Sequence, residues 1–207
     1  MNGRFISLEG GEGVGKSTQA RRLAAALEAR GIDVVLTREP GGSAGAEAIR
    51  ALLLEGDGAR WSARSEALLF AAARADHVAR TIRPALERGA WVICDRFIDS
   101  SRAYQGAGGI DDADILALHR IGSGGLLPDR TLLLALPAGE AAARAERRDA
   151  GAADRIGGRD AAYHASVAAL LERFADAEPT RFRVIDANGG EEEVTARLLA
   201  ALDGLAS

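Results

Sequence analysis

Among the 26 lysine and arginine residues of the chain, only Lys16 is a lysine. It lies in a glycine-rich segment, Gly10-Gly11-Glu12-Gly13-Val14-Gly15-Lys16-Ser17, that matches the phosphate-binding P-loop. Glycines let backbone N–H groups point at phosphate oxygens, and a slender ammonium reaches between phosphates where a guanidinium is too broad. The segment predicts a nucleoside triphosphate site in which the Ser17 hydroxyl binds Mg²⁺. A chance match is disfavoured because an apolar strand precedes the segment and a helical pattern follows it.

Apolar runs and helical patterns alternate along the whole chain. The apolar runs predict strands at 5–8, 34–37, 91–95, 131–136 and 182–185. The helical patterns lie at 16–30, 46–54, 65–88, 112–121, 138–148, 160–175 and 191–202. Strands joined through helices form parallel sheets, because each right-handed crossover returns over one face. We therefore predict a three-layer α/β/α sandwich with a five-stranded parallel sheet, forming a single domain over residues 1–207.

The composition excludes several classes of protein. The 207 residues are 47% hydrophobic and carry a net charge of −4, which suits one buried core and gives no general attraction to nucleic acid. No apolar run approaches the roughly 20 residues of a membrane helix. Cys94 is the single cysteine, and Met1 leads directly into the first predicted strand. We expect a cytoplasmic protein that binds neither nucleic acid nor membrane.

Polar residues follow the predicted strands, at the sheet edge where ligands of such folds bind. Asp95 and Arg96 end the third strand, and Arg38 follows the second. Beside a P-loop, a carboxylate such as Asp95 helps to hold Mg²⁺, although an aspartate there also caps turns. Arg38, Arg74 and Arg96 supply more positive charge than one triphosphate needs. They predict a second anion site for a phosphorylated acceptor facing ATP; the alternative is that they are ordinary surface arginines.

A further group of arginines surrounds a loose stretch at 149–153. The group consists of Arg144, Arg147, Arg148 and Arg155. The pattern resembles a lid over about 144–158 that closes on ATP, excludes water and brings a cation to the γ-phosphate. A solvated helix end would equally explain Arg147 and Arg148. Arg155 is therefore the stronger candidate for the lid cation.

Several separated segments together resemble the thymidylate kinases of the bacterial type, which convert dTMP to dTDP. The segments extend over nearly the whole chain, at 8–17, 37–42, 69–77, 95–101, 103–106 and 154–156. The P-loop identifies only a superfamily, whereas Arg-Glu-Pro-Gly-Gly at 38–42 and the Asp-Arg-Phe, Ser-Ser and Ala-Tyr-Gln-Gly segments within 95–106 are specific to this family. The resemblance implies a fold like that of P-loop nucleoside monophosphate kinases. It also implies transfer of the γ-phosphate of ATP to dTMP, with Mg²⁺, for dTTP synthesis.

The resemblance implies roles for residues around the acceptor nucleotide. Phe70 would stack on thymine, Arg74 would donate to its O4, and Ser101 and Gln105 would complete the contacts with the base. Tyr104 would press against the sugar where a ribose 2′-hydroxyl would project. Specificity must come from such ring-edge contacts, because an aromatic face binds any base.

The resemblance also assigns the remaining site residues. Glu9 would meet the 3′-hydroxyl side of the sugar, and Arg38 and Arg96 would clamp the acceptor phosphate. The residues expected to act in catalysis are Glu9, Lys16, Asp95, Arg96 and Arg155, with Ser17 and Asp95 as the metal ligands. The residues expected to bind ATP are Gly10, Gly11, Glu12, Gly13, Val14, Gly15, Lys16, Ser17, Thr18 and Arg144. No general base is needed, because the acceptor phosphate is already anionic.

Some positions depart from the family pattern or fit a second interpretation. The loop at 106–110 lacks a usual arginine, Gly157 replaces a usual glutamate, and Arg102 replaces a neutral residue. His77 follows Arg74 by one turn, where it either supports that arginine or lies on the helix surface. The family is typically homodimeric, and the small side chains at 67–75 suit close packing against a second copy.

Other P-loop proteins fit parts of the pattern. The nearest is another phosphotransferase, either a nucleoside monophosphate kinase for a different base or a deoxynucleoside kinase. A deoxynucleoside kinase would need a carboxylate base such as Glu9, but Arg38 and Arg96 would then have no charge to bind. A GTPase-like switch typically contains Asn-Lys-x-Asp, which is absent because Lys16 is the only lysine.

Overall fold

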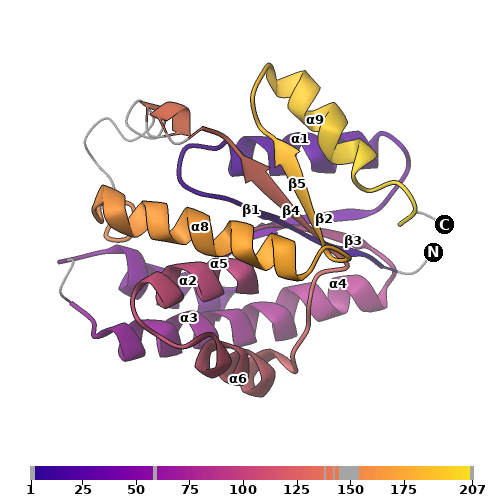
Figure 1. Cartoon of the computed structure of the whole chain (residues 1–207). Helices are drawn as coiled ribbons and strands as arrows, with labels where there is room; N and C mark the ends of the chain where they lie inside the picture. The colour runs from indigo at the N-terminus through magenta and orange to yellow at the C-terminus, as the bar shows by residue number, and fades with distance from the viewer. Residues whose placement is uncertain (1–2, 58–59, 138, 142, 145–153, 206–207) are drawn as a thin grey trace.

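The computed structural model describes residues 3–57, 60–137, 139–141, 143–144 and 154–205. Within these residues, one parallel sheet has the strand order β2-β3-β1-β4-β5. Its strands are β1 (Phe5–Glu9), β2 (Val34–Arg38), β3 (Trp91–Asp95), β4 (Arg130–Ala135) and β5 (Phe182–Asp186). Figure 1 shows this sheet between two layers of helices. The predicted five-stranded parallel sheet in a three-layer sandwich is therefore confirmed.

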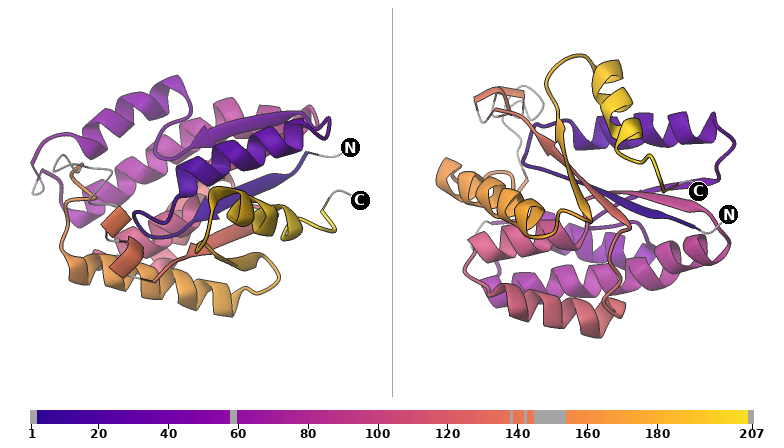
Figure 2. Two further views of the ribbon diagram at one scale, coloured as in Figure 1. Left: turned by 90° about the horizontal axis from the view of Figure 1, so that it is seen from above. Right: turned by 45° about the vertical axis from the view of Figure 1, so that its right-hand side comes forward.

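The helices divide unequally between the two faces of the sheet (Figures 1 and 2). One layer contains α1 (Lys16–Glu28) and α9 (Glu191–Ala200), which pack against each other. The other layer contains α3 (Ala63–His77), η1 (Val78–Ile82), α4 (Arg83–Glu87), α5 (Ile98–Ala107), α6 (Asp112–Ser123) and α8 (Ala161–Ala177), with α2 (Ala44–Leu54) packed on α3.

The central strand β1 is buried on both faces and places the P-loop. Ile6 and Leu8 pack in the core below α1 and α9, whereas Phe5 packs in the core of the other layer. On its two sides, Leu8 pairs with Asp95 of β3 and with Leu132 of β4. The segments after β1 and β3 therefore emerge side by side at the carboxyl edge of the sheet, where ligands bind in such folds.

Apart from small shifts of their ends, the helices differ from the prediction in two places. The sequence pattern did not predict α5, and the single helix predicted over 65–88 is interrupted by the π turn η1. Pro84 explains that turn, because proline cannot donate to the carbonyl four residues earlier and its ring crowds that group. In the predicted helix 138–148, residues 139–141 and 143–144 are helical. The rest of that prediction, including Arg147 and Arg148, lies outside the described residues.

None of the helices that the structure describes is long and apolar enough to cross a bilayer.

Candidate functional site

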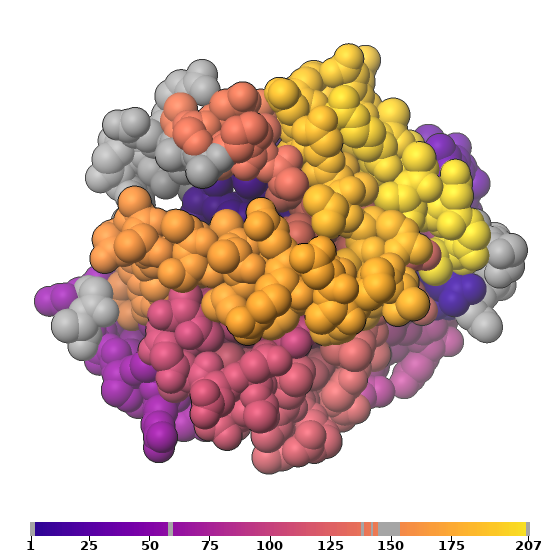
Figure 3. Space-filling view, in the orientation of Figure 1, coloured from indigo at the N-terminus to yellow at the C-terminus, as the bar shows by residue number. Residues whose placement is uncertain are grey.

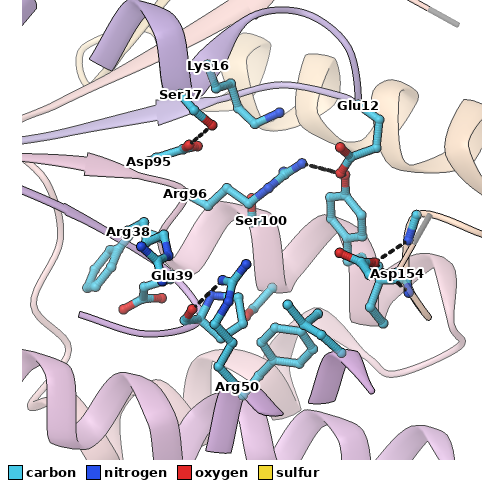
Figure 4. Close-up of a pocket in the computed structure, with 18 of the residues that line it drawn as sticks. Glu12, Lys16, Ser17, Arg38, Glu39, Arg50, Asp95, Arg96, Ser100 and Asp154 are labelled. Carbon is cyan, nitrogen blue, oxygen red and sulfur yellow. Dashed lines mark hydrogen bonds and ion pairs between the residues drawn. The ribbon is translucent and has the colours of Figure 1, made fainter. Parts of the chain in front are cut away.

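A cavity of about 680 Å³ opens at the carboxyl edge of the sheet. It extends from the P-loop at Lys16 and Ser17, past Asp95 and Arg96, to Phe70 on α3. Figure 3 shows N-terminal atoms at the bottom of a hollow beside α8, and Figure 4 shows the side chains inside. The cavity thus joins the predicted triphosphate site to the predicted base site.

The P-loop has the backbone geometry that its glycines predict. Gly15 is the N-cap of α1 with a φ of 94°, a left-handed value that residues with a Cβ rarely adopt. The amino end of α1 therefore borders the cavity, and the first turn of a helix offers unpaired N–H groups and a positive dipole end. The Lys16 ammonium donates to the Gly11 carbonyl at 2.6 Å. Burial lowers the pKa of Lys16 from 10.5 to about 8, and Arg96 adds to this effect, so a bound anion would stabilise its charged form.

Ser17 and Asp95, the two predicted Mg²⁺ ligands, lie in direct contact. The Ser17 hydroxyl donates to Oδ2 of Asp95 (Figure 4). The other carboxylate oxygen, Oδ1, is buried and has no hydrogen-bond partner in the described part of the chain. Mg²⁺ is usually held by one or two protein oxygens together with water and substrate phosphates. The residues present therefore fit the predicted Mg²⁺ site.

Arg96 connects the P-loop to α5. Its Nη1 donates to the Gly10 carbonyl and to the Ser100 hydroxyl, both at 3.1 Å, and its Nη2 donates to Glu12 at 2.6 Å and to the Tyr104 hydroxyl at 3.0 Å. Its φ of 70° is left-handed, which costs a non-glycine residue about 1–2 kcal/mol. The surrounding contacts hold the backbone in this strained form, and they aim the guanidinium between the two halves of the cavity.

Two more arginines face the cavity beside Arg96, and sequence reasoning found only one of them. Arg38, which is 54% exposed, donates to both carboxylate oxygens of Glu47 at 3.1 Å. Arg50 on α2 was missed; it donates to the Pro40 carbonyl at 2.6 Å and borders the cavity. Burial lowers the pKa of Arg50, and the nearby Arg38 lowers it further. Two guanidinium groups that repel each other at one wall form a site for an anion.

Arg74 is held by a chain of buried polar groups. Its Nε donates to Glu39 at 2.7 Å, and its Nη2 donates to the Ser101 hydroxyl at 2.6 Å. Glu39 also lies 3.0 Å from Nδ1 of His77, whose Nε2 lies 2.7 Å from the Thr37 hydroxyl. His77 therefore supports Arg74 through Glu39, and Nη1 of Arg74 has no partner among the described residues.

Gly42 lies directly beside this chain of polar groups. Its φ of 84° is left-handed, and a Cβ there would collide with the His77 ring and the Thr37 hydroxyl. Only glycine fits this position, which explains in part why the turn at 38–42 has its particular sequence.

Two carboxylates of the predicted site occupy different positions. Glu9 is fully buried and does not border the cavity: it accepts from the Phe97 N–H at 2.8 Å and from the Ser100 hydroxyl at 2.5 Å. Glu12, predicted as an ATP-binding residue, borders the cavity and meets Tyr104. Burial raises the pKa of Glu9 from 4.5 to about 8, with Asp99 adding to the effect. Glu9 thus fixes the turn between β3 and α5 from behind.

This pKa predicts how the stability of a Glu9→Gln variant compares with that of the wild type. The folded chain binds the Glu9 proton more tightly than the unfolded chain does, so folding is favoured at low pH and this contribution is lost as the pH rises from 4.5 to about 8. Relative to Glu9→Gln, the wild type should lose up to about 1.4 kcal/mol of unfolding free energy per pH unit in this window. Urea unfolding of both proteins across this range tests it; parallel curves would contradict the raised pKa.

Arg155, the predicted lid cation, does not border the cavity. Its Nη2 donates to Glu66 at 2.5 Å and its Nε donates to the Leu53 carbonyl at 2.7 Å. A catalytic role for Arg155 would require this buried ion pair to open. Arg144, by contrast, borders both the main cavity and a smaller one of about 200 Å³ on the outer side of the P-loop.

Arg102, whose surroundings the sequence left open, points into the protein. It donates to Asp99 at 3.1 Å, to Asp112 at 2.8 Å and to Glu178 at 2.7 Å. Its guanidinium also lies 4.0 Å from the centre of the Phe174 ring. These contacts join α5, which carries Ser101, to α6 and α8.

Phosphoryl transfer between two nucleotides needs two anion sites that face each other, and this cavity has cationic groups at both ends. On a parallel sheet with a P-loop after its central strand, that arrangement defines the class of P-loop nucleotide kinases. Within this class the chain belongs to the thymidylate kinase family, because the model of that family matches residues 8–198.

Individual relatives agree with this assignment. A thymidylate kinase of Rhizorhabdus wittichii is 65% identical over 206 residues, covering 99% of each chain. One from Caulobacter vibrioides is 54% identical over 197 residues, covering 95% of this chain and 94% of the relative. The crystal structure of thymidylate kinase from Ehrlichia chaffeensis superposes with a TM-score of 0.78 at 32% identity, covering 98% of this chain and 100% of the other.

Proposed function

We infer that the chain is an ATP-dependent thymidylate kinase, which transfers the γ-phosphate of ATP to dTMP and gives dTDP and ADP. The observation that carries the mechanism is the position of Arg96, which contacts both the P-loop and α5. ATP places its phosphates on the P-loop under Lys16, and dTMP places its phosphate against Arg38, Arg50 and Arg96. Catalysis then consists mainly of alignment and of neutralising the repulsion between the two phosphates. The product is one phosphorylation short of dTTP, so the enzyme serves dTTP synthesis in the cytoplasm.

Mg²⁺ is the cofactor, with Ser17 and Asp95 as its protein partners. The orphaned, buried Oδ1 of Asp95 supports this assignment, since an acceptor without a donor at that place suits a hydrated cation. When bound, the ion neutralises charge on the ATP phosphates. Loss of turnover in EDTA, restored by added Mg²⁺, checks the requirement.

The base pocket lies at the α3–α5 end of the cavity. Phe70 is half-buried and borders the cavity, so one face of its ring can stack on thymine. Arg74 has Nη1 available to donate to O4, and Tyr104 and Glu12 lie where the sugar would pass between base and phosphate. Glu12 is therefore better placed than Glu9 to meet the 3′-hydroxyl.

The geometry disfavours a deoxynucleoside kinase. Activation of a 5′-hydroxyl requires a carboxylate base within hydrogen-bond reach of it. Glu9 is buried outside the cavity, where it accepts from the Phe97 N–H and the Ser100 hydroxyl. Glu12 accepts a hydrogen bond from Arg96. An acceptor that already carries a phosphate needs no such base, in agreement with the cluster of arginines.

Arg144 is the described arginine best placed to bring a lid cation to ATP, because it borders the cavities on both sides of the P-loop. In the same geometry, Arg155 anchors the segment that follows the lid to α3 and α2. A fall in turnover on Arg144→Ala without a fall in dTMP binding would agree with this division of roles.

The chain forms a homodimer through the face made by α2, α3 and α6. Each of these neighbouring helices carries an exposed apolar side chain: Leu52, Leu68 and Ile121 are 38%, 56% and 81% exposed. Part of the small-residue stripe at 67–75 packs within the chain instead, because a Cβ on Gly122 of α6 would lie 3.2 Å from the Ala75 Cβ. Light scattering of the wild type and of Leu68→Glu tests the dimer and its face.

Replacement of Arg74 by glutamine should weaken the preference for thymine. The glutamine keeps a donor for Glu39 but removes the charged donor for O4, so kcat/KM with dTMP should fall about 10²-fold while kcat/KM with dCMP falls less. Steady-state ADP release with ATP, Mg²⁺ and each nucleotide measures both values. Arg80→Gln, at a 77% exposed arginine on η1, is the matched control. An unchanged preference would contradict the role of Arg74.

A further inference from the structure

The carboxylate of Glu66 joins two parts of the site that are far apart in sequence. Glu66 lies on α3 and is 3% exposed. It accepts from Nη2 of Arg155 at 2.5 Å and from Nη2 of Arg159 at 2.7 Å, both in the segment that follows the lid. It also accepts from Nε2 of Gln105 on α5 at 3.4 Å. Of the roles assigned above, only the anchoring of the segment after the lid by Arg155 uses this carboxylate.

The contact with Glu66 decides which way the amide of Gln105 points. An ionised carboxylate can only accept hydrogen bonds, so it repels the amide oxygen and attracts the amide nitrogen. Nε2 of Gln105 therefore faces Glu66 and Oε1 faces away from it. Oε1 is buried, has no hydrogen-bond partner in the described part of the chain, and belongs to a residue that borders the cavity. Gln105 thus carries an acceptor that still needs a donor, in a residue at the border of the cavity.

We propose that Glu66 is a specificity-determining positioning residue, which fixes the Gln105 amide so that its oxygen meets the N3–H of thymine. The proposal rests on the base pocket described under Proposed function. Thymine carries a hydrogen on N3, whereas cytosine has a lone pair there. A fixed acceptor therefore pairs with thymine and faces cytosine with two acceptors in opposition, which costs affinity.

Arg155 and Arg159 hold the Glu66 carboxylate in one position, as selection of the base through Gln105 requires. Arg155 is itself fixed by the Leu53 carbonyl through Nε, and Arg159 lies over the ring of Tyr163, 4.5 Å from its centre. Two guanidinium groups that donate to the same carboxylate restrain its rotation. Base selection by Gln105 is therefore supported by the segment that follows the lid, through one shared carboxylate.

The test compares Glu66→Gln with the wild type, using ATP, Mg²⁺ and either dTMP or dCMP. A neutral amide at 66 can donate as well as accept, so Gln105 becomes free to present either end to the base. We expect kcat/KM for dTMP to fall about 10-fold, mainly through KM, and kcat/KM for dCMP to rise. A gain with dCMP is decisive, because mere structural damage lowers both values.

Two controls separate failure of this inference from failure of the base pocket. Arg159→Gln removes one cation from Glu66 but leaves Arg155 and the Gln105 contact, so it should lower the dTMP preference less than Glu66→Gln does. Gln105→Leu should lose that preference. If Gln105→Leu loses the preference and Glu66→Gln keeps it, the inference is overturned and the pocket stands. If Gln105→Leu keeps the preference, the inference falls, and the pocket falls with it only if Arg74→Gln keeps the preference as well.

Should Glu66→Gln fail to fold, the wild-type complex with dTMP decides the question by NMR. Nuclear Overhauser contacts from the Gln105 amide hydrogens to the Glu66 side chain support the proposal. Contacts from those hydrogens to the base overturn it.

Discussion

Replacement of Lys16 by alanine is expected to lower kcat by about 10³-fold or more, with little effect on folding. Lys16 is buried at the amino end of α1 and folds over the P-loop toward Gly11. Its pKa, lowered to about 8 mainly by burial, shows that the free protein holds this charge at a cost. Loss of the side chain removes that cost together with the cation proposed to bridge the phosphates, so activity should fall while the unfolding free energy stays equal or rises.

Lys16→Arg distinguishes position from charge. The guanidinium keeps the charge but is too broad for the loop, so we expect a loss close to that of Lys16→Ala. Arg30→Ala, which removes an exposed cation just beyond α1, serves as the control for net charge. Single-turnover measurement of ADP formation, with urea unfolding alongside, gives both quantities. If Lys16→Arg kept most of the activity, Lys16 would act through its positive charge alone and not through the shape of its ammonium group.

The parts of the fold that could be predicted are those whose signal is local. The strands are continuous apolar runs because β1 and β3 are buried on both faces, and the glycines of the P-loop specify their own backbone. Asp95 and Arg96 could be placed in the site for a similar reason, since the carboxyl ends of parallel strands meet at one edge.

The helix α5 could not be predicted, because it has no solvent-facing side. All of Ile98–Gln105 are buried, so polar and apolar residues follow one another without the period of an amphipathic helix. Its polar side chains are instead satisfied by distant partners: Asp99 accepts from Arg102 and Arg181, and Ser100 donates to Glu9. Such pairings are a property of the tertiary structure and leave no pattern in the sequence.

The positions of Arg155 and Arg50 show the same limit within the site. Both are single arginines among many. Where each guanidinium points is set by a contact with another part of the chain, which is Glu66 for Arg155 and the Pro40 carbonyl for Arg50. Sequence reasoning predicted that arginines bind the acceptor phosphate. It could not rank them, because burial and partners decide which guanidinium faces the cavity.

Replacement of Arg96 by lysine is expected to lower kcat/KM for dTMP by about 10²-fold, with kcat and KM both affected. Its two terminal nitrogens serve four acceptors, on the P-loop and on α5. An ammonium has three donors on one atom, so it cannot keep Glu12, Tyr104 and the loop carbonyl in place and also bind the acceptor phosphate.

Arginine and lysine both carry a Cβ, so both strain the backbone equally at the left-handed φ of residue 96. The substitution Arg96→Lys therefore tests the guanidinium alone. Arg38→Lys is the matched control. That arginine is more than half exposed and contacts one carboxylate, so its replacement should cost less than about 10-fold and mainly in KM. Steady-state kinetics with dTMP and ATP varied in turn separates the two effects. Equal losses in the two variants would mean that Arg96 is only one of several phosphate ligands, and that the alignment of donor and acceptor depends on other groups.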